Sequence, residues 1–273
     1  MFKKILAVVL GLVLCLGMTM MVGCGDSAFS GNYVEADSNT ITTFSESVQQ
    51  AEDEGASQKV DFNAGVRAKV YMETEGMKLT SDYTMALVDD TFKLAGNLDM
   101  QMEMDYGGVA SKNITKGKFW YADSYMFMDA NATSVLGDNS TTVALKGKMP
   151  MDIEEVLLTY GGGEQLETLP LAEYVQYVES EHVKFYIDNE SENKKVKIVF
   201  DNLVEDGDQI DGTIIFVYDV DFNLIATSMD LTTTITYGGE TETFITRISV
   251  EPFDGAINVP ADAMTWTTIP TYM

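Results

Sequence analysis

The sequence has few of the side chains that carry nucleophilic and metal chemistry. Its 273 residues include two cysteines, Cys15 and Cys24, and one histidine, His182. Zinc and thiolate sites need clustered cysteine and histidine, so we predict no metal site and no cofactor. His182 has no G-x-S-x-G nucleophile pattern beside it in the sequence, and we interpret it as a surface residue. We predict no catalytic residue, with a carboxylate-based hydrolase as a distant alternative because acidic residues occur throughout.

Basic residues are also scarce in this sequence. The chain has 17 Lys and Arg against 43 Asp and Glu, and its formal net charge is −26 at pH 7. Binding to nucleic acid relies on a basic face that releases counterions from phosphates, and the sequence has no basic run. The acidic residues are spread along the chain, which is typical of a solvated exterior. We therefore expect no nucleic-acid partner.

One acidic segment begins like a calcium loop. Asp219, Asp221 and Asn223 alternate as in the first half of such a loop, and Asp230 stands at its twelfth position. Leu224 occupies the sixth position, where a calcium loop needs glycine, and the flanking residues alternate as strands do. We interpret the segment as a hairpin turn.

The one long apolar run of the chain spans residues 5–22. Two lysines precede it, and Gly23 ends it before Cys24. A short positive region, an apolar stretch and a small residue form the pattern of a secretory signal, so residues 1–23 are predicted to be a signal peptide. The alternative is an uncleaved transmembrane helix, because an apolar run of this length is near the minimum that spans a bilayer.

The junction Met21-Val22-Gly23-Cys24 resembles the lipobox of bacterial lipoproteins, in which leucine is usual at the place of Met21. The resemblance implies that the Cys24 thiol is lipidated and becomes the mature N-terminus. The protein would then be lipid-anchored on the extracytoplasmic face of the cell membrane. The polar residues that follow the cysteine, 24–37, are predicted to form a flexible tether.

Apolar and polar residues alternate over most of the chain after residue 59. Strict alternation indicates strands with one apolar and one solvated face, as in an antiparallel sheet covered on one side. Turn-forming pairs such as Lys116-Gly117 and Asp123-Ser124 separate the runs. Helical spacing occurs between Tyr33 and Gly55, where Ile41, Phe44 and Val48 lie three and four residues apart. It occurs again between residues 150 and 180, where two short helices are predicted.

These patterns predict an α+β fold. Residues 38–273 are expected to form a single domain with a large curved antiparallel sheet, a half-barrel open on one side. Two or three helices are expected to pack on its concave face. The tail from residue 257 is expected to be irregular or edge-like because prolines remove ladder hydrogen bonds.

The order of these features resembles the LolA/LolB-like and LppX/LprG-like lipoproteins. Gly117–Tyr121 and Tyr125–Met128 are similar to the group's turn followed by an aromatic strand pair, and Ile257–Ala263 is similar to its closing stretch. The resemblance covers most of residues 38–263. It implies an unclosed LolA/LppX-like half-barrel whose cavity accepts acyl chains or a lipidated partner. No binding residue is carried over, because the group has no sharp motif.

Methionine is abundant in the middle of the chain, where ten methionines lie between Met72 and Met151. Methionine is flexible and polarizable, and surfaces that accept varied apolar ligands use it for that reason. The predicted ligand-binding residues are Met85, Leu87, Leu94, Leu98, Met100, Met102 and Met104. The alternative is that these side chains form an ordinary core between the sheet and its helices.

The sequence thus predicts an extracytoplasmic lipoprotein that is not an enzyme and that binds or carries a hydrophobic ligand, a lipid or an acyl chain. The alternative is a surface interaction or sensor module with a solid core and no ligand. The predicted partners are the membrane, reached through the lipid on Cys24, and a hydrophobic small molecule. No protein partner follows from the sequence.

Overall fold

The computed structural model describes residues 28–53, 65–88, 91–105, 110–137, 139–151, 171–188, 190–205, 207–237 and 240–269. The predicted signal peptide, Cys24 and the first of the two helices predicted between residues 150 and 180 lie outside these residues. Within the described part of the chain, no helix is both long and apolar enough to cross a bilayer.

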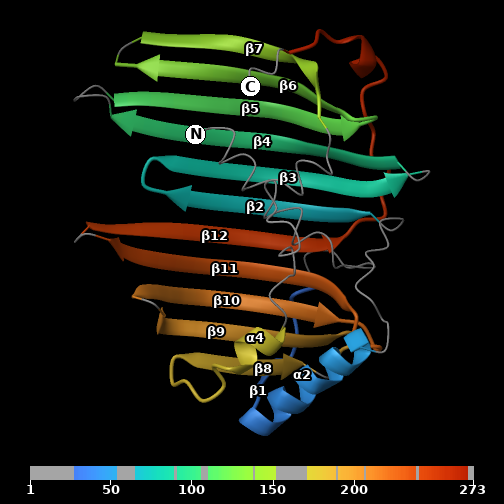
Figure 1. Cartoon of the computed structure of the whole chain (residues 1–273), viewed down its shortest axis with the longest axis vertical. Helices are drawn as coiled ribbons and strands as arrows, with labels where there is room; N and C mark the ends of the chain where they lie inside the picture. Colours follow the sequence, from blue (N-terminus) through green and yellow to red (C-terminus); the bar gives the residue numbers. More distant parts are fainter. Residues whose placement is uncertain are drawn as a thin grey trace.

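Twelve strands form one antiparallel sheet, and its two edges do not meet (Figure 1). The strand order is β1-β8-β9-β10-β11-β12-β2-β3-β4-β5-β6-β7. The strands are β1 (Val34–Glu35), β2 (Val66–Thr74), β3 (Met77–Val88), β4 (Thr91–Asp105), β5 (Ala110–Ala122), β6 (Tyr125–Leu136), β7 (Asn139–Pro150), β8 (Val183–Asp188), β9 (Lys194–Glu205), β10 (Asp208–Tyr218), β11 (Leu224–Tyr237) and β12 (Glu240–Pro252). The predicted large antiparallel sheet of an α+β protein is confirmed.

The sheet consists of two meanders that meet at one seam. Strands β2 to β7 follow one another as neighbours, and so do strands β8 to β12. The last strand of the chain, β12, then pairs with β2, with Ile248 opposite Val70 and Val250 opposite Ala68. The seam therefore joins strands that are far apart in the sequence, a contact that forms only after a long loop has closed.

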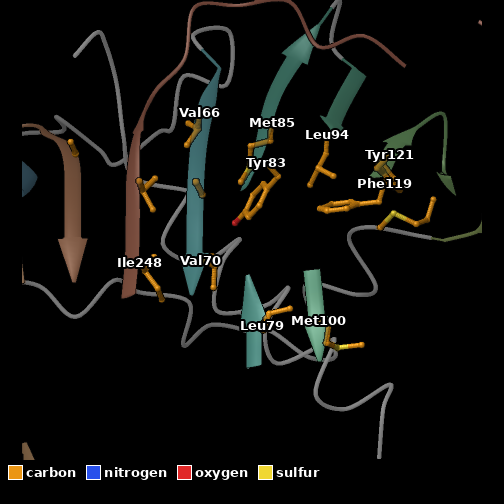
Figure 2. Packing of buried hydrophobic residues seen from close by; sticks show 14 of the residues in the cluster. Val66, Val70, Leu79, Tyr83, Met85, Leu94, Met100, Phe119, Tyr121 and Ile248 are labelled. Atoms are coloured by element: carbon orange, nitrogen blue, oxygen red, sulfur yellow. The ribbon is translucent and has the colours of Figure 1, made fainter. Parts of the chain in front are cut away.

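The register places apolar side chains on one face of the sheet. Met85 lies opposite Val66 on one side and Leu94 on the other, and Leu94 lies opposite Tyr121. Figure 2 shows such side chains from β2, β3, β4, β5 and β12 gathered into one buried cluster. Alternation along the strands thus becomes a two-faced sheet, as the sequence predicts.

Both described helices lie at one end of the sheet. Helix α2 (Ser38–Asp53) and helix α4 (Leu171–Val175) pack against β8 to β10, where Ile41, Phe44 and Val48 share a buried cluster with strand residues (Figure 1). The Asp37 carboxylate caps α2 by accepting the Thr40 backbone N–H at 2.8 Å. The expected placement of two or three helices across a concave face is therefore not what the described residues show, because both helices cover the β8–β10 end.

One predicted turn is confirmed and another is wrong. Asp123 and Ser124, with φ of 51° and 60°, connect β5 to β6 as the two central residues of a tight hairpin turn. Lys116-Gly117 was predicted as a turn but lies within β5. A Cβ at Gly117 would lie 2.3 Å from the Cα of Ala130 on β6, so this glycine permits close strand contact and does not form a turn.

The polar face of the sheet carries nearly all the lysine and arginine residues of the described strands. Many face an acidic residue on the next strand, with Lys116–Asp99 at 2.6 Å and Arg247–Asp230 at 3.0 Å. Exposed pairs of this kind contribute roughly 0–1 kcal/mol each. These pairs offset charge on the polar face and add little to the stability of the sheet.

Two terminal segments cover the ends of the polar face. The described part of the predicted flexible tether, residues 28–37, is instead attached to the sheet: it contains β1, which pairs with β8, and the Asn32 N–H donates to Asp188 at 3.1 Å. At the other edge, Ile269 donates to the Lys148 carbonyl at 2.7 Å, so the C-terminal tail lies beside β7 as the predicted edge-like segment. Short added strands of this kind protect open edges from pairing with other chains.

Candidate functional site

The residues predicted to bind a ligand lie on the apolar face of β3 and β4. Met85, Leu94 and Met100 are buried, with at most 6% of their surface exposed. Leu98 and Met102 are half-buried, while the side chains of Leu87 and Met104 lie outside the described residues. The structure thus brings five of the seven to one face, in the register that alternation predicts.

This part of the apolar face is tightly packed. The rings of Tyr83 and Phe119 lie 6.4 Å apart between their centroids (Figure 2), and Gly96 is the cross-strand neighbour of both residues. A Cβ at Gly96 would lie 2.7 Å from Phe119 Cζ, so the absence of a side chain there makes room for the ring. Such packing matches the alternative that these methionines and leucines belong to an ordinary core.

A groove with an apolar floor opens elsewhere on the same face, between the α4 segment and β9 to β11. We call it the apolar groove, and its volume is about 370 Å³. Its floor is made of apolar side chains from three strands: Phe200, Leu203, Ile210, Ile214, Met229 and Leu231. Its wall consists of residues of α4 and the turn that follows. The apolar floor of the groove therefore suits an apolar ligand.

Aromatic contacts hold the wall of the apolar groove in place. The Tyr174 ring lies 6.1 Å from the Phe200 ring and 5.9 Å from the Phe216 ring, between centroids. Each contact of this kind contributes roughly 0.5–1.5 kcal/mol beyond the area it buries. Helix α4 has only five residues, so these rings, more than helix propensity, position it on the sheet.

The rim of the apolar groove is polar and acidic. Glu173 and Glu205 both line it, and the Tyr177 hydroxyl donates a hydrogen bond to the Glu205 carboxylate. Burial, followed by the negative charge of Glu173, raises the pKa of Tyr174 to about 12. Tyr174 therefore stays an uncharged phenol at neutral pH, and the floor beside it carries no charge.

The raised Tyr174 pKa predicts a loss of stability at alkaline pH. Between pH 10 and 12 the unfolded chain loses the Tyr174 proton while the folded chain keeps it, so the free energy of unfolding falls, by about 2 kcal/mol at most from this residue. The free energy of unfolding is measured by urea titration at about pH 9 and about pH 11.5, on either side of the usual tyrosine pKa. Tyr174→Phe should show a smaller fall between the two than the wild type. An equal fall in wild type and variant would contradict the prediction.

The sequence did not single out the apolar groove, although its parts were visible. The stripe on the predicted helix near residue 170 includes Tyr174, and Met229 and Leu231 alternate within a predicted strand. Their meeting depends on a β-bulge between Ile210 and Gly212 and on the docking of α4, and neither has a signal in sequence spacing.

The calcium-like acidic segment is a turn and His182 is a surface residue, as the sequence predicts. Asp219 Oδ1 accepts the backbone N–H groups of Asp221 and Asn223, each at 2.9 Å, so the calcium-like segment is a tight turn between β10 and β11. His182 is exposed and its Nδ1 lies 2.8 Å from the Asp201 carbonyl oxygen. Among the described residues, no group of three His, Cys, Asp or Glu side chains is arranged to hold a metal ion.

Comparisons with known proteins add little to these observations. No protein-family model matches the chain, and no curated protein matches it. Among solved structures, the N-terminal dehydratase from the difficidin assembly line is 9% identical over 85% of this chain and 88% of that chain, with a TM-score of 0.11. A TM-score this low does not indicate a shared fold.

Proposed function

We propose that the protein is an extracytoplasmic lipoprotein, anchored to the membrane by a lipid on Cys24, that binds or carries a hydrophobic ligand without catalysing a reaction. The ligand would be a lipid or a single acyl chain. The open sheet would act as a half-barrel, with the ligand on its apolar face. The lipobox-like junction supports the anchor, and the apolar groove supports the ligand.

The apolar groove is the observation that carries this proposal. Its volume of about 370 Å³ falls within the roughly 300–1,000 Å³ of small-molecule sites. Half-buried Met229 and Leu231 lie in its floor, and their exposed apolar surface would be covered by an alkyl chain. Each buried methylene contributes about 0.8 kcal/mol, so about ten buried methylenes supply the roughly 8 kcal/mol of a micromolar complex, before the entropic cost of association is subtracted.

The acidic rim of the apolar groove indicates which head group fits. Glu173 and Glu205 would repel a carboxylate or phosphate placed at the mouth. A neutral or cationic amphiphile meets no such repulsion, and its head group could donate hydrogen bonds to the rim. We therefore expect hexadecanol or a hexadecyl amine to bind more tightly than palmitate.

Native mass spectrometry of residues 25–273 would test the proposal. After delipidation, the protein is expected to retain one hexadecanol per chain. Leu231→Gln should weaken binding by about 10-fold or more, because it places an amide in the floor of the apolar groove. Met102→Gln is the matched control, since Met102 is also half-buried on the apolar face but lies outside the groove.

The two substitutions distinguish a ligand in the apolar groove from one on the methionine-rich face of β3 and β4. Loss of binding in Met102→Gln and not in Leu231→Gln would move the ligand to the methionine-rich face. Absence of any bound amphiphile would contradict the carrier and leave the alternative, an interaction module with a solid core. The close packing of Met85, Leu94 and Met100 is the observation that favours that alternative.

A further inference from the structure

A second hollow lies on the opposite, polar face of the sheet. It crosses β2 to β5 and is bounded by the segment that follows β12, with a volume of about 520 Å³. We call it the polar groove. The polar and aromatic residues that line it include Arg67, Asp82, Thr84, Asn97, Trp120 and Asn258. It shares no lining residue with the apolar groove.

Small side chains in one cross-strand row make the polar groove hollow. Arg67 lies opposite Thr84, Thr84 opposite Ala95, and Ala95 opposite Trp120. The row therefore has a large side chain at each end and small ones between. At a strand spacing of about 4.8 Å, its two ends are roughly 14 Å apart. That width accommodates one or two sugar rings.

Arg67 and Asp82 hold each other in position within the polar groove. Arg67 donates two hydrogen bonds to the Asp82 carboxylate, from Nε at 3.0 Å and from Nη2 at 2.6 Å. This bidentate pair fixes both planar groups on rigid strands, so little side-chain entropy is lost when a ligand binds. Asp82 oxygens have further lone pairs, and the Asn97 and Asn258 amides offer both donors and acceptors.

An aromatic wall completes the polar groove. Trp120 is held by an edge-on contact with Trp266, whose ring centroid lies 5.9 Å away at 79°. Phe253 lines the groove as well. The electron-rich face of an aromatic ring attracts C–H groups that carry a slight positive charge, as those of a sugar ring do.

Charge narrows the class of ligand further. The Arg67 and Asp82 charges offset each other, and Lys118 is the one remaining ionised group of the lining. Sites for phosphate-rich ligands contain several clustered cations, and sites for apolar ligands have mostly uncharged linings. The lining of the polar groove has neither property. A ligand with an apolar ring face and a rim of hydroxyl groups matches it.

We propose that the polar groove binds a short, uncharged saccharide of one or two rings. Hydroxyl groups would bond to Asp82, Arg67 and Asn97, and a ring face would lie against Trp120. This activity is independent of the hydrophobic ligand on the other face. Loss of amphiphile binding would leave it intact, and loss of saccharide binding would leave the carrier proposal intact.

The test uses the full chain in a detergent without a sugar head group, such as an amine oxide. Cello-, xylo- and chito-oligosaccharides of one to four units are titrated while calorimetry and tryptophan fluorescence are recorded. We expect at least one series to bind with a Kd in the micromolar to millimolar range. Asn97→Ala should weaken that binding by about 5-fold or more, because a hydrogen-bonding group of the groove is lost.

The control is Asn131→Ala, an equally exposed asparagine on the polar face of β6, outside the groove, and it should bind as the wild type does. Both asparagines are exposed, so neither change should unfold the protein. Failure of every saccharide series to bind would overturn the proposal, as would equal affinity in the two variants. Binding abolished by about 0.5 M salt would also overturn it, because it would indicate an ionic ligand.

Discussion

Replacement of Cys24 by serine is expected to move the protein from the membrane pellet to the soluble extracytoplasmic fraction. The sulfur atom is the attachment point that the lipobox-like junction implies, and a serine hydroxyl cannot form the thioether. Anchoring by acyl chains gains about 0.8 kcal/mol per buried methylene, and stable anchoring takes two chains or one chain with a basic patch. The formal net charge of −26 disfavours binding to an anionic membrane surface, so loss of the lipid should release nearly all of the protein.

Cys15→Ser provides the matched control for this experiment. Cys15 lies within the apolar run of residues 5–22, so Cys15→Ser is the same chemical change as Cys24→Ser but leaves the junction intact. That variant should stay with the membrane. Retention of Cys24→Ser in the pellet after a high-salt wash would contradict lipid anchoring and favour an uncleaved transmembrane helix.

Substitution of Asp188 by alanine should destabilise the fold by about 3 kcal/mol, because several donors lose a charged acceptor. Asp188 is fully buried at the end of β8. Its carboxylate accepts the Ser191 hydroxyl at 2.6 Å, the Glu190 N–H at 3.0 Å and the Asn32 N–H at 3.1 Å. The bond to Asn32 connects the N-terminal segment to the sheet, so that segment should also become more sensitive to protease.

Acid should reproduce part of this loss in the wild type. Burial acts to raise the Asp188 pKa, but the hydrogen bonds from Ser191, Glu190 and Asn32 outweigh it and lower the pKa below its usual value. A lowered carboxyl pKa stabilises the fold above the pKa of the unfolded chain, and this contribution is lost as the pH falls below about 4. Asp188→Asn should not show that part of the pH dependence.

Glu190→Ala is the control for both measurements, since Glu190 is exposed and its side chain accepts one hydrogen bond from Asn32. Its free energy of unfolding in urea should stay within about 0.5 kcal/mol of the wild type. An Asp188→Ala protein as stable as Glu190→Ala would show that the buried carboxylate does not hold the N-terminal segment.

Local patterns were enough to predict most of the elements. Alternating residues predicted the strands because one face of each had to be buried, and the spacing of Ile41, Phe44 and Val48 predicted helix α2 for the same reason. Asp123-Ser124 was recognised as a turn because short polar residues tolerate a positive φ. The prediction of a turn at Lys116-Gly117 is wrong because glycine occurs both in turns and where two strands approach closely.

The sequence did not predict which distant segments pair with each other. Nothing in the alternation of β12 indicated that it would pair with β2, and the expected tether gave no sign that Asn32 would bond to Asp188. Both contacts depend on three-dimensional proximity that local spacing does not encode.

The sequence by itself therefore determined the strand-rich α+β class, the two-faced strands and helix α2. Each of these follows from the identity and spacing of neighbouring residues. Only the tertiary structure decided where the two grooves lie. The docking of α4 places Tyr174 and Leu231 in the lining of one groove, and strand register places Arg67 and Trp120 at the two ends of the row that forms the other. A hollow is a property of several segments packed together, and no single segment contains it.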